Sequence, residues 1–199
     1  MKKSYDCLIV GIGGQGIILA SNVVGDACVL EGRHVSGTET HGMSQRGGSV
    51  ETHIRIDGKY GPLIAPGTAD LLISFDVLEA LRYRHFLKQD GTMIVNREMT
   101  VPTSVFANKL PVPKIEDVEA ELKATGVKVI LVNATEIAAS VGSPLAANIV
   151  LLGAASHALP LASASLLEAV RRNVPQKTVK INEKAFDLGR EAWIELNSS

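Results

Sequence analysis

The first constraint on the fold is a glycine-rich turn that follows a short apolar run near the amino terminus. Residues 7–10 are Cys-Leu-Ile-Val, and residues 17–20, Ile-Ile-Leu-Ala, resume apolar character at helical spacing after the turn. Between them, Gly11, Gly13 and Gly16 have the G-x-G-x-x-G spacing of a strand–turn–helix unit. Glycine allows the positive φ angles and the close backbone approach that such a turn requires. The sequence therefore predicts a strand that enters a helix through a tight turn.

This predicted turn is a candidate site for an anion or for a partner protein. The N–H groups in the first turn of a helix have no intrahelical acceptor, and the helix dipole places partial positive charge at the same end. An anion bound there would gain roughly 0.3–1 kcal/mol from the dipole, or about 2 kcal/mol in a partly buried site. The candidate ligand- or partner-binding residues are Gly11, Gly13, Gly14, Gln15 and Gly16.

Strand-like and helix-like segments alternate along the rest of the chain. Strands are predicted near residues 34–36, 49–56, 69–75, 92–96 and 127–132, and helices over residues 15–30, 77–87, 115–125 and 134–141, from 144 and from 182. This alternation predicts a three-layer α/β/α fold with a mostly parallel, Rossmann-like sheet. Apolar and polar residues alternate over residues 49–56, and Asp57-Gly58 is a hairpin signal, so an antiparallel hairpin excursion is expected near residues 49–64. Residues 1–199 are expected to form a single domain.

Composition argues against two classes of partner. The formal net charge is −1 without a basic cluster, so the sequence lacks an electrostatic footprint for nucleic acid or an anionic membrane. The apolar run at residues 149–152 falls short of the ~20 residues of a membrane span, and the amino-terminal run is too short for a signal peptide.

Cys7 and Cys28, in apolar surroundings, are expected to be reduced core thiols. A cytoplasmic protein without a membrane partner is expected.

A second glycine-rich segment follows the second predicted strand. It lies within residues 38–48, which show no strand or helix periodicity. Loops that leave the carboxyl ends of strands line the ligand crevice of an open α/β sheet, so this segment is expected beside the glycine turn. Its arginine supplies five donors suited to phosphate or carboxylate, although a solvated surface loop is the alternative. The candidate active-site or interface residues are His41, Met43, Ser44, Gln45, Arg46, Gly47 and Gly48.

Several functions remain open from the residues alone. A dinucleotide site also needs an acid at the end of the second strand to bind the ribose, and the nearest acid, Glu39, lies beyond a glycine in the irregular segment. A free-standing NAD(P)- or flavin-dependent oxidoreductase, a turn that only packs helix on strand, and a site for another anion or a partner are the alternatives. The sequence shows no metal-ligand spacing, nucleophile elbow or Walker-type lysine loop. His53 is expected on a solvated strand face, and Asn148 is expected to hydrogen-bond backbone.

Taken together, the two glycine-rich segments resemble a known family. Residues 11–17, G-I-G-G-Q-G-I, followed by H-G-M-S-Q-R-G-G-S-V over residues 41–50, resemble the gamma-type subunit or domain of 2-oxoacid:ferredoxin oxidoreductases. The second segment most resembles the branch formed by the beta subunits of indolepyruvate:ferredoxin oxidoreductases. Residues 148–154 also resemble the late helix of the family, so the likeness spans most of the chain.

The resemblance implies a subunit that binds no cofactor by itself and is inactive alone. In the family, thiamine diphosphate and 4Fe-4S clusters belong to a catalytic alpha-type partner subunit, which decarboxylates a 2-oxoacid oxidatively to its acyl-coenzyme A and passes electrons to ferredoxin. This chain would complete the active site or the coenzyme A site for an aryl-pyruvate such as indolepyruvate. A purely structural docking subunit is the alternative, and a homodimer is a further expectation for the isolated chain.

Overall fold

Six strands form one sheet in the computed structural model, which describes residues 4–41 and 48–198. The order across the sheet is β2-β3-β1-β4-β5-β6. Strands β1, β4, β5 and β6 are parallel, whereas β3 runs antiparallel to both of its neighbours, β1 and β2. The predicted mostly parallel sheet with an antiparallel excursion is confirmed. The bounds are β1 (Tyr5–Ile12), β2 (Val35–His41), β3 (Ser49–Ile56), β4 (Ala69–Ser74), β5 (Leu87–Asn96) and β6 (Lys128–Val132).

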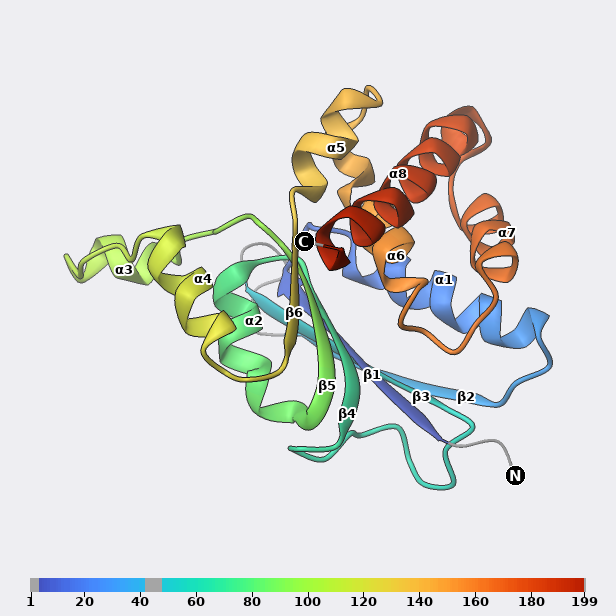
Figure 1. Ribbon diagram of the computed structural model, residues 1–199, viewed down its shortest axis with the longest axis horizontal. Coiled ribbons are helices and arrows are strands. Elements are labelled where there is room, and N and C mark those ends of the chain that lie inside the picture. Colours follow the sequence, from blue (N-terminus) through green and yellow to red (C-terminus); the bar gives the residue numbers. More distant parts are fainter. Residues whose placement is uncertain (1–3, 42–47, 199) are drawn as a thin grey trace.

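Helices cover both faces of the sheet, which gives the expected three layers (Figure 1). One face carries α1 (Ile17–Leu30), α6 (Ala147–Ala155), α7 (Ser163–Asn173) and α8 (Val179–Asn197). The other face carries α2 (Val77–Tyr83) and α4 (Ile115–Lys123). The shorter elements are η1 (Arg84–Phe86), α3 (Thr103–Ala107), α5 (Ala134–Ser140), η2 (Pro144–Ala146) and η3 (Gln176–Thr178). Within the described residues, none of these helices has the length and apolarity to cross a membrane.

Strand β1 lies between the two halves of the core. Cys7 and Ile9 pack into the cluster formed with α1 and α6–α8, and Leu8 and Val10 pack into the cluster formed with α2 and α4. All four side chains are fully buried, as expected for a central strand that is covered on both faces. Apolar residues on both sides of one strand explain why the run that leads into the glycine turn is continuous rather than alternating.

The structure corrects the interpretation of residues 38–41 as irregular. Strand β2 continues to His41, and its residues pair antiparallel with β3 from Val35 opposite Ile56 to His41 opposite Val50. Strand β2 is the edge of the sheet, and it is half-buried or exposed along most of its length. An edge strand with solvated polar side chains has little apolar periodicity, so the sequence pattern hid it.

The expected return strand of the hairpin, residues 60–64, is not a strand, and the expectation of a solvated His53 is wrong. His53 on β3 is 2% exposed, and its Nδ1 accepts the N–H of Ile64 at 3.1 Å. Burial lowers the pKa of His53, against the opposing effect of Glu51. Ile64, itself buried, therefore covers His53 on the side of β3 that was expected to face solvent, and β1 and β2 supply the antiparallel pairing of β3 instead.

Helices α6 and α8 approach each other at two glycines. A Cβ atom on Gly153 would lie 2.0 Å from the carbonyl oxygen of Phe186, and a Cβ atom on Gly189 would lie 2.0 Å from that of Val150. Only a hydrogen at each position permits this contact between backbones. The contact sets α8 close against α6, the helix that also carries Asn148 to the glycine turn.

Candidate functional site

The glycine turn has the predicted strand–turn–helix geometry. Gly14 has φ 108° and Gly16 has φ 83°, both in the region that disfavours side chains, and α1 begins at Ile17 directly afterwards. The N–H of Gln15 donates to the carbonyl of Ile12 at 3.1 Å, which closes the turn. The first N–H groups of α1 have no intrahelical acceptors, and the turn that leads into them follows the carboxyl end of β1.

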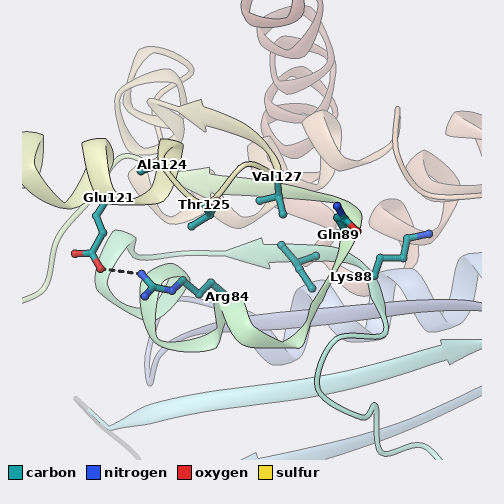
Figure 2. Close-up of a pocket in the computed structure, with 8 residues that line it drawn as sticks. Arg84, Lys88, Gln89, Glu121, Ala124, Thr125 and Val127 are labelled. Carbon is teal, nitrogen blue, oxygen red and sulfur yellow. Dashed lines mark hydrogen bonds and ion pairs between the residues drawn. The ribbon is translucent and has the colours of Figure 1, made fainter.

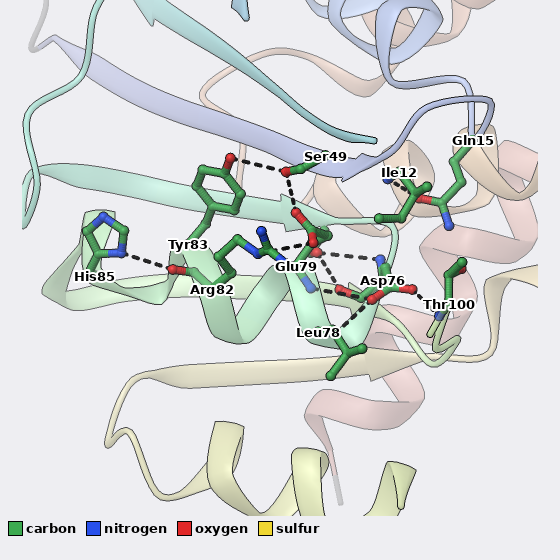
Figure 3. Close-up of polar contacts among 11 residues, drawn as sticks. Ile12, Gln15, Ser49, Asp76, Leu78, Glu79, Arg82, Tyr83, His85 and Thr100 are labelled. Carbon is green, nitrogen blue, oxygen red and sulfur yellow. Dashed lines mark hydrogen bonds and ion pairs between the residues drawn. The ribbon is translucent and has the colours of Figure 1, made fainter. Parts of the chain in front are cut away.

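The side chain of Gln15 stabilises the turn from inside. Its Oε1 accepts the N–H of Ile12 at 2.7 Å (Figure 3). The same oxygen fills the space beside Gly11, where a Cβ atom would lie 2.7 Å from it and 2.9 Å from the Cβ of Phe75. Gly11 leaves the space that the Gln15 side chain needs to close the turn. The Gln15 oxygen is therefore already bonded within the chain.

Asn148 of α6 holds the other end of the turn. Its Nδ2 donates to the carbonyl oxygen of Gly16 at 3.4 Å, and its Oδ1 accepts the N–H of Ile149 at 2.9 Å. The expectation that Asn148 bonds backbone is confirmed. A Cβ atom on Gly16 would lie 2.4 Å from this Nδ2, so the amide packs directly on a glycine that must remain bare.

The second glycine-rich segment meets the turn at its carboxyl end. The N–H of Gly13 donates to the carbonyl of Gly48 at 2.8 Å. The backbone of His41 ends β2 on the same edge of the sheet. Gly48 therefore lies beside the glycine turn as expected, whereas Met43, Ser44, Gln45, Arg46 and Gly47 lie outside the described residues.

A pocket of about 270 Å³ opens between the glycine turn and the carboxyl ends of β4, β5 and β6. The connection after β1 passes to α1 on one face, and the connection after β4 passes to α2 on the other, so this is the switch point where open α/β sheets bind ligands. The N–H of Phe75 joins these two strands by donating to the carbonyl of Val10 at 2.9 Å. The pocket is lined by Gly14, Gln15, Gly16, Phe75, Asn96, Glu98, Thr135, Pro144, Leu145 and Ala147.

Three polar residues of this pocket were missed by the sequence interpretation. The Oε2 atom of Glu98 accepts hydrogen bonds from Asn96 Nδ2 at 3.0 Å and from Thr135 Oγ1 at 2.5 Å. The Oδ1 atom of Asn96 accepts the N–H of Ala134 at 3.0 Å. Asn96 ends β5, so a polar residue at the carboxyl end of a predicted buried strand was the signal that could have identified it. The result is a carboxylate held in place at the mouth of the pocket.

A second polar cluster gathers around Ser49, the residue that follows Gly48, and Figure 3 shows its side chains. Ser49 Oγ donates to Glu79 Oε2 at 2.5 Å and lies 3.2 Å from the hydroxyl of Tyr83. Arg82 Nε lies 3.3 Å from Glu79 Oε1. Burial raises the pKa of Glu79, and the Ser49 hydrogen bond and Arg82 oppose that rise. Burial also raises the pKa of Tyr83.

Asp76 fixes the amino end of α2, the helix that carries Glu79. Its Oδ1 accepts the N–H groups of Leu78 at 2.8 Å and Glu79 at 3.4 Å, and its Oδ2 accepts the N–H of Thr100 at 2.5 Å (Figure 3). Burial raises the pKa of Asp76, while the three N–H donors oppose the rise. Asp76 is thus the N-cap of α2, a position at which aspartate is strongly preferred.

Another pocket, of about 510 Å³, lies near the start of β5 and the loop before β6, away from the glycine turn (Figure 2). Its cations are already paired: Arg84 Nη1 donates to Glu121 Oε1 at 2.8 Å, and Lys88 Nζ lies 2.7 Å from Asp70 Oδ1. Neither cation is available as an isolated charge for an anionic ligand. This pocket therefore adds nothing to the site at the switch point.

The described residues do not assemble a metal centre: no group of three or more His, Cys, Asp or Glu side chains among them could hold an ion. Cys7 and Cys28 are buried free thiols, and burial raises the pKa of Cys28 to about 12. A 4Fe-4S cluster takes four thiolates, so these two residues do not fit one. In this part of the chain, the site offers backbone donors and a fixed carboxylate, which are groups that bind and orient a ligand.

The sequence matches the model of the pyruvate ferredoxin/flavodoxin oxidoreductase family over residues 6–192. The indolepyruvate oxidoreductase subunit IorB of Archaeoglobus fulgidus is 40% identical over 184 residues, 92% of each chain. The IorB subunit of Pyrococcus horikoshii is 38% identical over 98% of each chain. The 2-oxoglutarate synthase subunit KorC of Methanothermobacter thermautotrophicus is 31% identical over 94% of each.

Two solved structures share the fold. The gamma subunit of a keto/oxoacid ferredoxin oxidoreductase from Geobacter sulfurreducens superposes with a TM-score of 0.71 at 26% identity, covering 96% of this chain and 99% of that one. A 2-oxoglutarate:ferredoxin oxidoreductase from Magnetococcus marinus, with 2-oxoglutarate, coenzyme A and succinyl-CoA bound, gives a TM-score of 0.75 at 20% identity. It covers all of this chain and 32% of its own, so the same fold also occurs within a longer polypeptide.

Proposed function

The chain belongs to the pyruvate ferredoxin/flavodoxin oxidoreductase family, and we propose that it is the gamma-type subunit of a 2-oxoacid:ferredoxin oxidoreductase that acts on indolepyruvate or a related aryl-pyruvate. The observation that carries the proposal is the 40% identity to an indolepyruvate oxidoreductase subunit over nearly the whole of both chains. Residues 1–199 would form one domain of this type, because the described strands share one sheet.

In this proposal the chain supplies binding groups and a partner supplies the chemistry. A catalytic alpha-type subunit would hold thiamine diphosphate and the 4Fe-4S clusters and pass electrons to ferredoxin. The two buried thiols of this chain do not fit a cluster, which supports placing the clusters elsewhere. The partner would be needed for turnover, and this chain alone would be inactive.

Coenzyme A is the proposed ligand of the glycine turn. Its phosphates suit the N–H groups and dipole at the start of α1. The carboxylate of Glu98 disfavours a second anion in the pocket, so only an uncharged part of such a ligand would enter it. Leu145, 88% exposed at the pocket mouth, offers an apolar contact to that part or to the partner subunit.

Two alternatives are weaker. In a dinucleotide-binding sheet the second strand lies beside the first and its terminal acid binds the ribose, whereas here β3 lies between β1 and β2. Glu39 lies within β2 and not at its end, which is His41. Its Oε1 accepts a hydrogen bond from Ser21 Oγ at 3.3 Å. The other alternative is a docking subunit whose loops never meet substrate.

Substitution of Arg46 separates the active-site and docking roles. The Arg46→Ala variant should assemble normally with the catalytic subunit and lower kcat/KM for ferredoxin reduction about tenfold or more, because a guanidinium positioned on an anion would be lost. The measurement is steady-state ferredoxin reduction by the purified complex with indolepyruvate, and Arg190→Ala on α8 serves as a matched control. Normal turnover in an intact Arg46→Ala complex would favour the docking role.

A further inference from the structure

Among the described residues, a backbone hydrogen bond from the N–H of Gly13 to the carbonyl of Gly48, at 2.8 Å, joins the glycine turn to the end of the second glycine-rich segment. Ser49 is the next residue along the chain and the first of β3, where it pairs with Ile12 at the end of β1. Sheet pairing between β1 and β3 ends at this position. The carbonyl of Gly48 belongs to the peptide bond that leads into Ser49. An interaction that restrains Ser49 therefore also restrains this carbonyl relative to the glycine turn.

Glu79 of α2 holds the side chain of Ser49 by a hydrogen bond. Its carboxylate accepts the hydroxyl of Ser49 at 2.5 Å, and Tyr83, one turn further along α2, places its own hydroxyl 3.2 Å from the same oxygen (Figure 3). The Asp76 cap fixes the start of α2, so Glu79 projects from a rigid first turn. The side chains of Glu79, Tyr83 and Ser49 thus meet beside the junction of Gly13 and Gly48.

Burying the carboxylate of Glu79 in the protein interior costs free energy. Glu79 is 2% exposed, and Val77 and Ala80 on the same helix are fully buried apolar residues. A group needed only for packing would be apolar, because burying a charge is unfavourable unless hydrogen bonds and charge partners compensate. Arg82 compensates only in part, since its side chain is 56% exposed and solvent weakens the pair.

We propose that Glu79 is a positioning residue that acts through the Ser49 hydroxyl to hold the carbonyl of Gly48 against the N–H of Gly13 in the glycine turn. Its consequence for turnover rests on the proposed function, whereas its consequence for the junction does not. The groups that face this carboxylate are Arg82 and Tyr83 from α2, Asp76 at the cap of that helix, and Ser49 from β3. Glu51 of β3 is hydrogen-bonded to Tyr83.

Hydrogen exchange of the isolated chain tests the junction directly. In the Glu79→Gln variant, the Gly13 amide should exchange about tenfold faster, because a neutral amide holds the Ser49 hydroxyl less strongly than a carboxylate. The amide of Phe75, which donates to Val10 on the other side of β1, should keep its rate. The Ser49→Ala variant should show the same change, and the double variant should show no further one. Unchanged Gly13 exchange, equal acceleration at Phe75, or additive effects would each overturn the proposal.

A kinetic experiment on the assembled enzyme tests the consequence for turnover. Glu79→Gln should lower kcat/KM about tenfold without loss of subunit association. The matched control is Glu121→Gln, which removes a carboxylate paired with Arg84 in the distant pocket (Figure 2) and should change kcat/KM less than twofold. Accelerated exchange at Gly13 with unchanged kinetics would overturn the role in turnover, and failure of the wild-type complex to turn over would instead contradict the proposed function.

Discussion

The glycines of the turn have different physical roles, although the sequence pattern treats them alike. Gly11 is needed for space, because Gln15, Phe75 and Ile17 surround it closely. Gly14 is needed for its φ of 108°, with no atom within 4 Å of the position of a Cβ. Gly16 is needed for both reasons, since its φ is 83° and Asn148 packs on it. The cost of a methyl group should therefore differ among them.

Alanine at Gly16 should destabilise the chain more than alanine at Gly14. The positive φ alone should cost about 1–2 kcal/mol at either position. At Gly16 the displaced Asn148 amide should add about 1–3 kcal/mol, because it would also lose its bond to the Gly16 carbonyl. Urea unfolding of the Gly16→Ala and Gly14→Ala variants measures both values. Equal losses would show that Asn148 does not restrain the turn.

Residue patterns predicted the turn well and the pocket poorly. The spacing of Gly11, Gly13 and Gly16 is local information. The meeting of Asn96, Glu98 and Thr135 depends on the order of β5 and β6 in the sheet. That order is set by packing between segments far apart in the chain. The same reason explains why the contact between Glu79, an ordinary helical acid in the sequence, and Ser49 was not predicted.

At the scale of elements, the α6–α8 contact positions Asn148. Gly153 and Gly189 allow the two backbones to approach, and α6 then presents Asn148 to the glycine turn. Trp193, further along α8, stacks on His157 just beyond α6 with ring centroids 5.8 Å apart. A change that separates these helices should therefore affect the turn as well as the core.

Alanine at Gly189 should push α8 away from α6. A Cβ atom would lie 2.0 Å from the Val150 carbonyl oxygen, and backbone cannot move as easily as a side chain, so a loss of about 3 kcal/mol is expected. Gly25 on α1 is the matched control, since nothing lies within 4 Å of its Cβ position. Gly25→Ala should gain about 0.5–1 kcal/mol from lower backbone entropy in the unfolded chain. Thermal unfolding of both variants measures the difference, and a tolerated Gly189→Ala would contradict the close packing.

Element types were largely predictable, whereas strand pairing was not. Continuous apolar runs gave β1, β4 and β6, because strands covered on both faces lack polar positions. The alternation of β3 predicted one solvated face, but the loop that leads to Ile64 buries His53 on that face. A polar residue buried by a distant loop is not visible in periodicity. The edge strand β2 was underestimated because solvent, and not a core, sets its composition.

At the scale of the whole molecule, the described residues concentrate their binding features on one edge of the sheet. The glycine turn, the pocket with Glu98 and the junction of Gly13 and Gly48 all lie at the carboxyl ends of the strands. A chain with binding groups at this edge, in a family of ferredoxin oxidoreductases, is suited to complete the site of a catalytic partner. The central claim is therefore dependence: the partner should need this chain for turnover.

Titration of the catalytic subunit with this chain tests that claim most directly. A fixed amount of the proposed catalytic subunit is mixed with increasing amounts of this chain, and indolepyruvate-dependent ferredoxin reduction is followed in the presence of coenzyme A. The rate should rise from background to a plateau at a fixed subunit ratio, and neither subunit should be active alone. Full turnover without this chain, or no rise on its addition, would contradict the account.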